Sequence, residues 1–168
     1  AFTDEELIAE RQAFEQRRLD MLESQYANTY PAANQDNPGL YIWNRLDYAL
    51  AALYLNRDLP GASQAIIDAV NTSFDNPQDY EESFHWRGNL FYRIYKFFGH
   101  DSEYYPGRLT TEAEQAIYEV FWNWAKSKSK IVDTDVENSK TWWLWGSENH
   151  DAQRDTSSWS AASILKDV

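Results

Sequence analysis

Apolar residues recur at intervals of three and four along most of the chain, which is the spacing of one face of an α-helix. Three stretches show this pattern most clearly: about 40–56, 62–70 and 113–124. The residues expected to face inward are Ile42, Leu46, Ala49 and Leu53 in the first stretch, Ala62, Ala65, Ile66, Ala69 and Val70 in the second, and Ala113, Ile117, Val120, Phe121 and Trp124 in the third. A possible capping pair, Thr111 and Glu114, opens the third helix.

Two further helices are predicted from capping signals. Thr3 and Glu6 have the spacing of a capping box, and the helix after them is expected to reach about Tyr26. Asp79 and Glu82 form a second possible capping box. The helix after Thr3 has Leu7, Phe14 and Met21 on one stripe. The helix after Asp79 has a stripe of Phe84, Gly88, Phe91, Tyr95 and Phe98, and this helix is expected to end at Gly99.

The pattern lapses from Ile131 to about Asp151 and resumes in a last helix. This sixth helix is expected to start near Asp155 or Thr156, and it carries Trp159, Ala162 and Leu165. It runs to the final residue without a stop signal, which suggests that the chain is an N-terminal part of a longer protein. No stretch alternates as a strand does. The sequence therefore predicts an all-α fold, a single α-helical domain over residues 1–168 built of helical hairpins.

Composition narrows the class of protein. The net charge is −12 and the pI about 4.6, so the chain lacks the basic surface that nucleic acids or anionic membranes require. There is no Cys, which excludes disulfides and thiolate metal sites, and no apolar run approaches the length of a membrane span. The opening "AFTDEEL" is consistent with a chain released by signal cleavage, which predicts a secreted or periplasmic location.

The irregular stretch contains the densest aromatic cluster, "WWLWGSENH". Trp142, Trp143 and Trp145 cannot all face one way in a regular element, so at least one is expected to line a groove. Because the CH faces of sugars stack on indole rings, an aromatic-walled groove is a reasonable carbohydrate site. The aromatic share of 16% agrees with this interpretation.

The segment "ENHDAQRDTSSWSAASIL" after this cluster resembles the Asn-His segment of the (α/α)-toroid polysaccharide lyases, the alginate-lyase-like and heparinase-like proteins. The preceding "WW" is similar to the Trp pair that lines the cleft of chondroitin and hyaluronate lyases in that superfamily. The resemblance spans only residues 142–165 and has a two-residue core. It implies that the chain forms part or all of a toroid.

The resemblance also implies roles in β-elimination on a uronate-containing glycan. Asn149 would hydrogen-bond the uronate carboxylate and stabilise the developing enolate-like charge, and His150 would accept the proton. Arg154, one turn on, is a candidate clamp for the carboxylate. A Tyr that the sequence does not identify would protonate the leaving oxygen. No cofactor is expected.

The same residues allow other interpretations. Asn149 and His150 can equally be a capping Asn and a structural His, and Glu148, His150 and Asp151 have metal-ligand chemistry, although adjacent residues rarely converge on one ion. No metal site is therefore predicted. His85 and Arg87, in "FHWRGN", are candidate substrate-binding residues if their turn faces the cleft, and core or surface residues otherwise.

The favoured function is a polysaccharide lyase acting on a polysaccharide or oligosaccharide. A glycoside hydrolase on the same scaffold, using carboxylates such as Glu148, is the enzymatic alternative. A non-catalytic helical glycan-binding protein is the alternative from another class. The reaction products distinguish these three functions. A lyase leaves an unsaturated sugar, a hydrolase leaves new reducing ends without an unsaturated sugar, and a binding protein leaves the glycan unchanged.

Overall fold

The computed structural model describes residues 2–28, 37–129 and 148–166, without the side chains of 127–129, 148–151 and 154. Every regular element in these ranges is a helix, which confirms the all-α fold class. The helices are α1 (Asp4–Ala27), α2 (Pro38–Leu55), α3 (Leu59–Asp75), α4 (Pro77–Phe98), α5 (Thr111–Ser129) and α6 (Glu148–Leu165).

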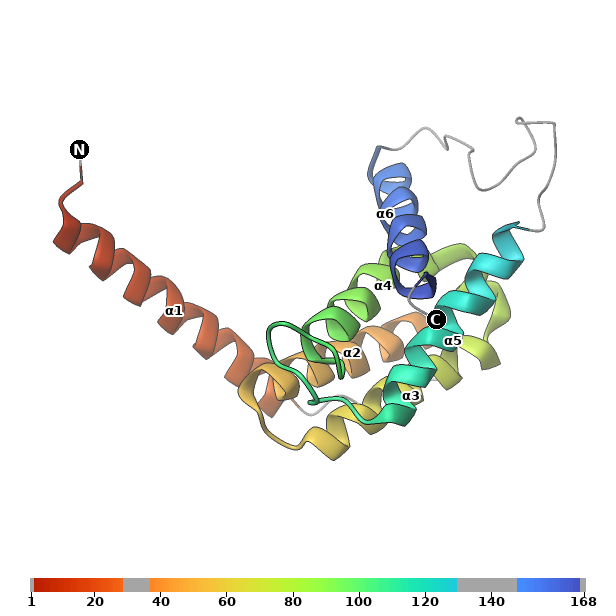
Figure 1. The fold of residues 1–168 in the computed structure, drawn as a ribbon, viewed down its shortest axis with the longest axis horizontal. Coiled ribbons are helices and arrows are strands. Elements are labelled where there is room, and N and C mark those ends of the chain that lie inside the picture. The colour runs from red at the N-terminus through yellow and green to blue at the C-terminus, as the bar shows by residue number, and fades with distance from the viewer. Residues whose placement is uncertain (1, 29–36, 130–147, 167–168) are drawn as a thin grey trace.

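Helices α2 to α5 form the body of the structure, and α6 lies across α4 and α5 (Figure 1). Helix α2 packs along α3, and both contact α4, while α5 contacts α3, α4 and α6. Helix α1 differs from the rest because it contacts only α2 among the described elements and projects away from the body (Figure 1).

The core consists of the faces that the hydrophobic pattern predicts. All the inward residues expected for α2, α3 and α5 are buried, which confirms those three stripes. In α4 the expected stripe is buried except for Tyr95, which is partly exposed. Aromatic rings join the helices, since Phe84 contacts the rings of Phe121 and Trp124, and the Tyr80 hydroxyl donates to the Val120 carbonyl. Burial of each large apolar side chain contributes roughly 1.5–3 kcal/mol.

Several predicted helix ends are corrected by the structure. Helix α4 begins at Pro77 rather than at an Asp79 capping box, because Pro at the first turn needs no amide partner and Asp79 pairs elsewhere. At α5 the cap is Thr110, whose Oγ1 accepts from the Ala113 amide at 3.2 Å. The Glu114 carboxylate accepts instead from the backbone amide of His100.

The largest correction concerns α6, which starts at Glu148, about two turns before the expected start. The residues of these turns are polar, so apolar spacing carried no signal for them. The residues that α6 buries also differ from those highlighted by the sequence. They are Ser157, Ser160, Ala161 and Ile164, whereas Trp159 is 59% exposed.

The capping box of α1 is confirmed, because the Glu6 amide donates to Thr3 Oγ1 at 3.2 Å and the Thr3 amide donates to Glu6 Oε2 at 2.8 Å. The hydrogen bond from the Thr3 backbone lowers the pKa of Glu6. The expected stripe, however, covers no core: Leu7, Phe14 and Met21 are all exposed. Only Leu22 of α1 is buried among the described residues.

The C-terminal end of α1 is fixed to α2 and to the α2–α3 turn. The Tyr26 and Tyr48 rings stack with centroids 5.7 Å apart, and Arg57 forms an ion pair of 2.6 Å with Glu23. The Tyr48 hydroxyl donates to Asp58 Oδ2 at 2.5 Å. Burial, together with this hydrogen bond to a carboxylate, raises the pKa of Tyr48 to about 12.

This raised pKa predicts a pH dependence of stability. The phenol of Tyr48 ionises at about pH 10 in the unfolded chain. The stabilisation that its neutral form gives the fold is therefore fully present below that pH and is lost as pH rises through about 12. We expect Tyr48→Phe to lose less stability than the wild type between about pH 9 and about pH 11.5. Thermal melts of both proteins at the two pH values measure the difference, and Tyr80 and Tyr54, whose pKa values are also raised by burial, contribute equally to both. Parallel losses in the two proteins would contradict the prediction.

None of the helices in the described part of the chain is both long enough and apolar enough to cross a lipid bilayer.

Candidate functional site

The predicted catalytic pair lies at the start of α6. Asn149 and His150 follow Glu148 within the first turn of that helix, and Arg154 lies one turn further on. The side chains of these residues are outside the described part, as are Trp142, Trp143 and Trp145 altogether. Their predicted roles therefore stay predictions, and the structure defines the surroundings of the helix that carries the pair.

A close approach of α4 and α6 positions this helix. A Cβ added to Gly88 would lie 2.5 Å from Ser157 Oγ and 3.0 Å from Ser157 Cβ, so a larger residue here would require Ser157 to move. Ser157 Oγ also donates to the His85 carbonyl of α4 at 3.0 Å, and Ser157 is fully buried. The two helices are thus joined by a glycine and a serine at their crossing.

Polar and aromatic contacts flank the crossing. Asn89 Nδ2 donates to Gln153 Oε1 at 2.6 Å, one turn beyond the Asn149 position along α6. Tyr92 contacts the exposed Trp159 ring with centroids 5.2 Å apart. The crossing therefore presents an indole, a phenol and two amides, which are the group types that stack on and hydrogen-bond to sugars.

These four residues were not among the sequence-predicted site residues. Asn89 and Tyr92 sit between the apolar positions of α4, and Gln153 and Trp159 lie on α6, whose contact face was not recognised. The only usable signal was Trp159, a large aromatic residue between serines in "TSSWSAAS". Small residues on both sides of a large one indicate that the small ones pack and the large one points out.

His85 is inside the body. It is 3% exposed, and its ring lies 5.0 Å from the Trp86 ring between centroids. Its carbonyl accepts the Ser157 bond, so His85 takes part in holding α6 through its backbone. The prediction that its side chain binds substrate is not tested by this position.

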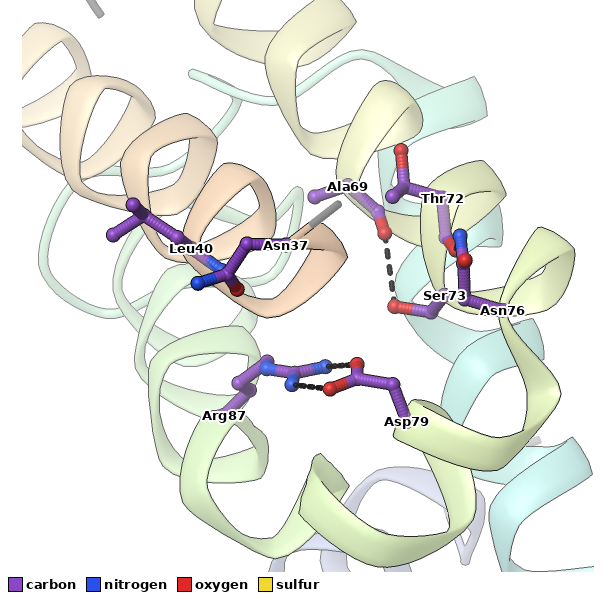
Figure 2. Close-up of polar contacts among 8 residues, drawn as sticks. All are labelled: Asn37, Leu40, Ala69, Thr72, Ser73, Asn76, Asp79 and Arg87. Atoms are coloured by element: carbon purple, nitrogen blue, oxygen red, sulfur yellow. Dashed lines mark hydrogen bonds and ion pairs between the residues drawn. The ribbon is translucent and has the colours of Figure 1, made fainter. Parts of the chain in front are cut away.

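Arg87 forms a buried ion pair with Asp79, eight residues earlier in the same helix (Figure 2). Arg87 Nη2 donates to Asp79 Oδ1 at 2.9 Å, and Nη1 lies 2.7 Å from Oδ2, although that second contact lacks the direction of a hydrogen bond. The arginine side chain is 2% exposed and the aspartate 25%. The guanidinium is thus buried against Asp79, and the predicted role of Arg87 in substrate binding stays a prediction.

The ion pair also fixes the start of α2. A Cβ on Gly39 would lie 3.0 Å from Arg87 Nη2 and 3.3 Å from Asp79 Oδ1, so the first turn of α2 rests directly on the pair. Asn37 caps this turn by accepting from the Leu40 amide at 3.0 Å (Figure 2). Arg87 thus joins two helix starts and is a structural residue of this junction.

A cavity of about 410 Å³ opens beside the junction. Its lining residues are Pro38, Asp75, Asn76, Pro77, Gln78, Asp79 and Glu82. Three carboxylates line it, and the two that are not paired with Arg87, Asp75 and Glu82, would repel the carboxylates of a polyuronate. Of the sequence-predicted site residues whose side chains are described, neither His85 nor Arg87 is among the lining residues. Across the described ranges no group of three His, Asp or Glu side chains is placed to hold a metal ion.

Fold and site together define an all-α protein with an aromatic and amide surface at the α4–α6 crossing. Comparison with protein-family models, with curated proteins and with solved structures finds no match in any of the three.

Proposed function

We propose that this chain is a carbohydrate-active protein, a polysaccharide lyase that cleaves uronate-containing glycan by β-elimination on part or all of an (α/α) toroid. The observation that carries the proposal is the surface at the α4–α6 crossing. There an exposed Trp159 with Tyr92 and the Asn89–Gln153 amide pair flank the helix whose first turn contains Asn149 and His150.

The start of α6 suits an anionic substrate group. The first amides of a helix lack partners within it and carry partial positive charge, which favours a carboxylate at that end. In the proposed reaction Asn149 donates a hydrogen bond to the uronate carboxylate, and Arg154 pairs with it. These contacts offset the bulk negative charge of the chain, which is −12.

The chemistry follows from this binding. His150 takes the proton from the carbon beside the carboxylate, and the electron pair of that C–H bond forms the new C=C bond. The bond to the glycosidic oxygen breaks, and a proton donor, a Tyr in the related family scheme, supplies the leaving oxygen with its proton. The hydrogen bond from Asn149 stabilises the transition state most, because negative charge then spreads onto the carboxylate.

A non-catalytic glycan-binding protein is the second candidate, favoured by one observation. The Trp159, Tyr92, Asn89 and Gln153 surface would bind a sugar without any contribution from Asn149 or His150. Glycan binding with no change in the glycan would therefore select this function.

The test uses a panel of uronate-containing glycans. We expect the protein to release products with a C=C bond, which absorb at the short-wavelength edge of the ultraviolet. Trp159→Ala is expected to weaken glycan binding by roughly 5- to 100-fold, the loss of about 1–3 kcal/mol typical of a stacking contact. Trp122→Ala is the matched control, because Trp122 is 45% exposed on α5.

Two results would overturn the proposal. New reducing ends without ultraviolet absorbance would show a hydrolase. Equal binding by the wild type, Trp159→Ala and Trp122→Ala would remove the α4–α6 crossing as the glycan surface.

A further inference from the structure

Helix α1 is an arm with an apolar stripe that no other element of the described residues covers. It is attached through Leu22, Glu23 and Tyr26, all in its last two turns, and the rest of its length extends from the body (Figure 1). Leu7, Phe14 and Met21 are 53%, 58% and 54% exposed, so the stripe is open along its whole length. A helix of this length gains most of its stability from packing, and α1 has little of it.

The stripe is symmetric about its middle. Leu7 and Met21 are each seven residues from Phe14, so all three lie on one side of the helix. When two copies of α1 run antiparallel with Phe14 beside Phe14, Leu7 of each copy meets Met21 of the other. A surface that matches itself under a two-fold rotation is what an isologous dimer interface requires.

The charges on one edge of the stripe match in the same register. Glu10 and Arg17 lie on one edge of the stripe, and the antiparallel arrangement brings Glu10 of each copy to Arg17 of the other. On the other edge Arg11 comes between Glu15 and Arg18 of the second copy, so each Arg11 meets one opposite charge and one like charge there. Within the described residues neither Glu10, Arg11 nor Arg17 has an ion-pair partner of its own, whereas Glu15 is paired with Arg18 at 2.8 Å.

A parallel pair is disfavoured on two grounds. It would bring the acidic first turns, Asp4, Glu5 and Glu6, side by side and would align the two helix dipoles. It would also place both folded bodies at the same end of the pair, since the body lies at the C-terminal end of α1 (Figure 1). The antiparallel pair separates the acidic turns and the bodies.

We propose that α1 is a self-association helix that pairs antiparallel with α1 of a second copy of this chain, centred on Phe14. The occupant of the stripe is thus a second identical chain, and the contact is independent of the α4–α6 crossing.

Sedimentation equilibrium over a concentration series tests the proposal. The wild type is expected to be a dimer at micromolar concentration, and Phe14→Glu is expected to raise the dissociation constant by about tenfold or more, since it puts two carboxylates at the centre. Gln16→Glu is the matched control, because Gln16 is exposed, two residues away and on the opposite side of the helix. Circular dichroism checks that both variants keep their helices.

Cysteine pairing tests the orientation, because the chain has no Cys of its own. Glu10→Cys and Arg17→Cys are each expected to remain without a disulfide when oxidised alone and to cross-link when the two variants are mixed. Cross-linking of each variant with itself would overturn the antiparallel arrangement. A wild type that stays monomeric, or a Phe14→Glu protein that dimerises as the control does, would overturn the proposal itself.

Discussion

Replacing His150 with alanine is expected to lower glycan turnover by about 10²–10⁴-fold, the usual loss when a general base is removed. The affinity for intact glycan is expected to change little, because the base acts mainly in the transition state. Asn149→Ala should cost about 10²–10³-fold in turnover, as for a lost oxyanion donor. Initial rates from ultraviolet absorbance and binding by calorimetry separate the two effects.

His100→Ala is the control for this experiment, because His100 is exposed in the loop after α4. It should keep full turnover and full stability. If His150→Ala instead lowers the melting temperature while turnover per folded molecule is unchanged, then Asn149 and His150 have a structural and not a catalytic role at the start of α6.

Removing one partner of the Asp79–Arg87 pair is expected to produce the largest loss of stability. Asp79→Ala leaves a guanidinium that is 2% exposed without its counter-charge, and such a change typically costs about 3–5 kcal/mol. Because Asp79 is itself 25% exposed, water can partly reach the site, and we expect a value near the lower end, about 3 kcal/mol. Urea unfolding followed by circular dichroism measures it.

The matched control is Asp75→Ala, which removes an exposed carboxylate at the C-terminal end of α3 and should change stability by no more than about 0.5 kcal/mol. The double variant Asp79→Ala with Arg87→Met should recover much of the loss, because no unpaired charge then stays buried. Equal and small effects of Asp79→Ala and Asp75→Ala would show that the ion pair contributes little.

The helices of the body were predictable because their inward faces are large and apolar. Ile42, Leu46 and Leu53 of α2, for example, repeat at helical spacing and are fully buried. The same rule predicted the α1 helix correctly, but Leu7, Phe14 and Met21, which repeat as regularly, are all exposed. Periodicity shows that a helix has an apolar face and does not show what covers that face.

The candidate site was less predictable, for a different physical reason. The α4–α6 crossing is formed by Gly88, Ser157 and the His85 carbonyl. Such small side chains and backbone groups cannot be recognised from the spacing of hydrophobic residues. Arg87 could be named as a residue of interest but not paired, since Asp79 has the spacing of a capping residue and the structure uses it as a counter-ion. Contacts made by small and charged groups depend on the approach of whole helices.

The composition of this crossing has a consequence for local opening. Among the α6 residues whose side chains are described, Ile164 is the one large apolar side chain that is fully buried, and Leu165 is partly buried, so the face of α6 contains fewer large apolar groups than that of α2. The amides of α6 should therefore exchange with solvent deuterium through an opening that costs less free energy than unfolding of α2 and α3. Any ligand that bridges Trp159 on α6 and Tyr92 on α4 would close this opening and slow exchange in α6 alone.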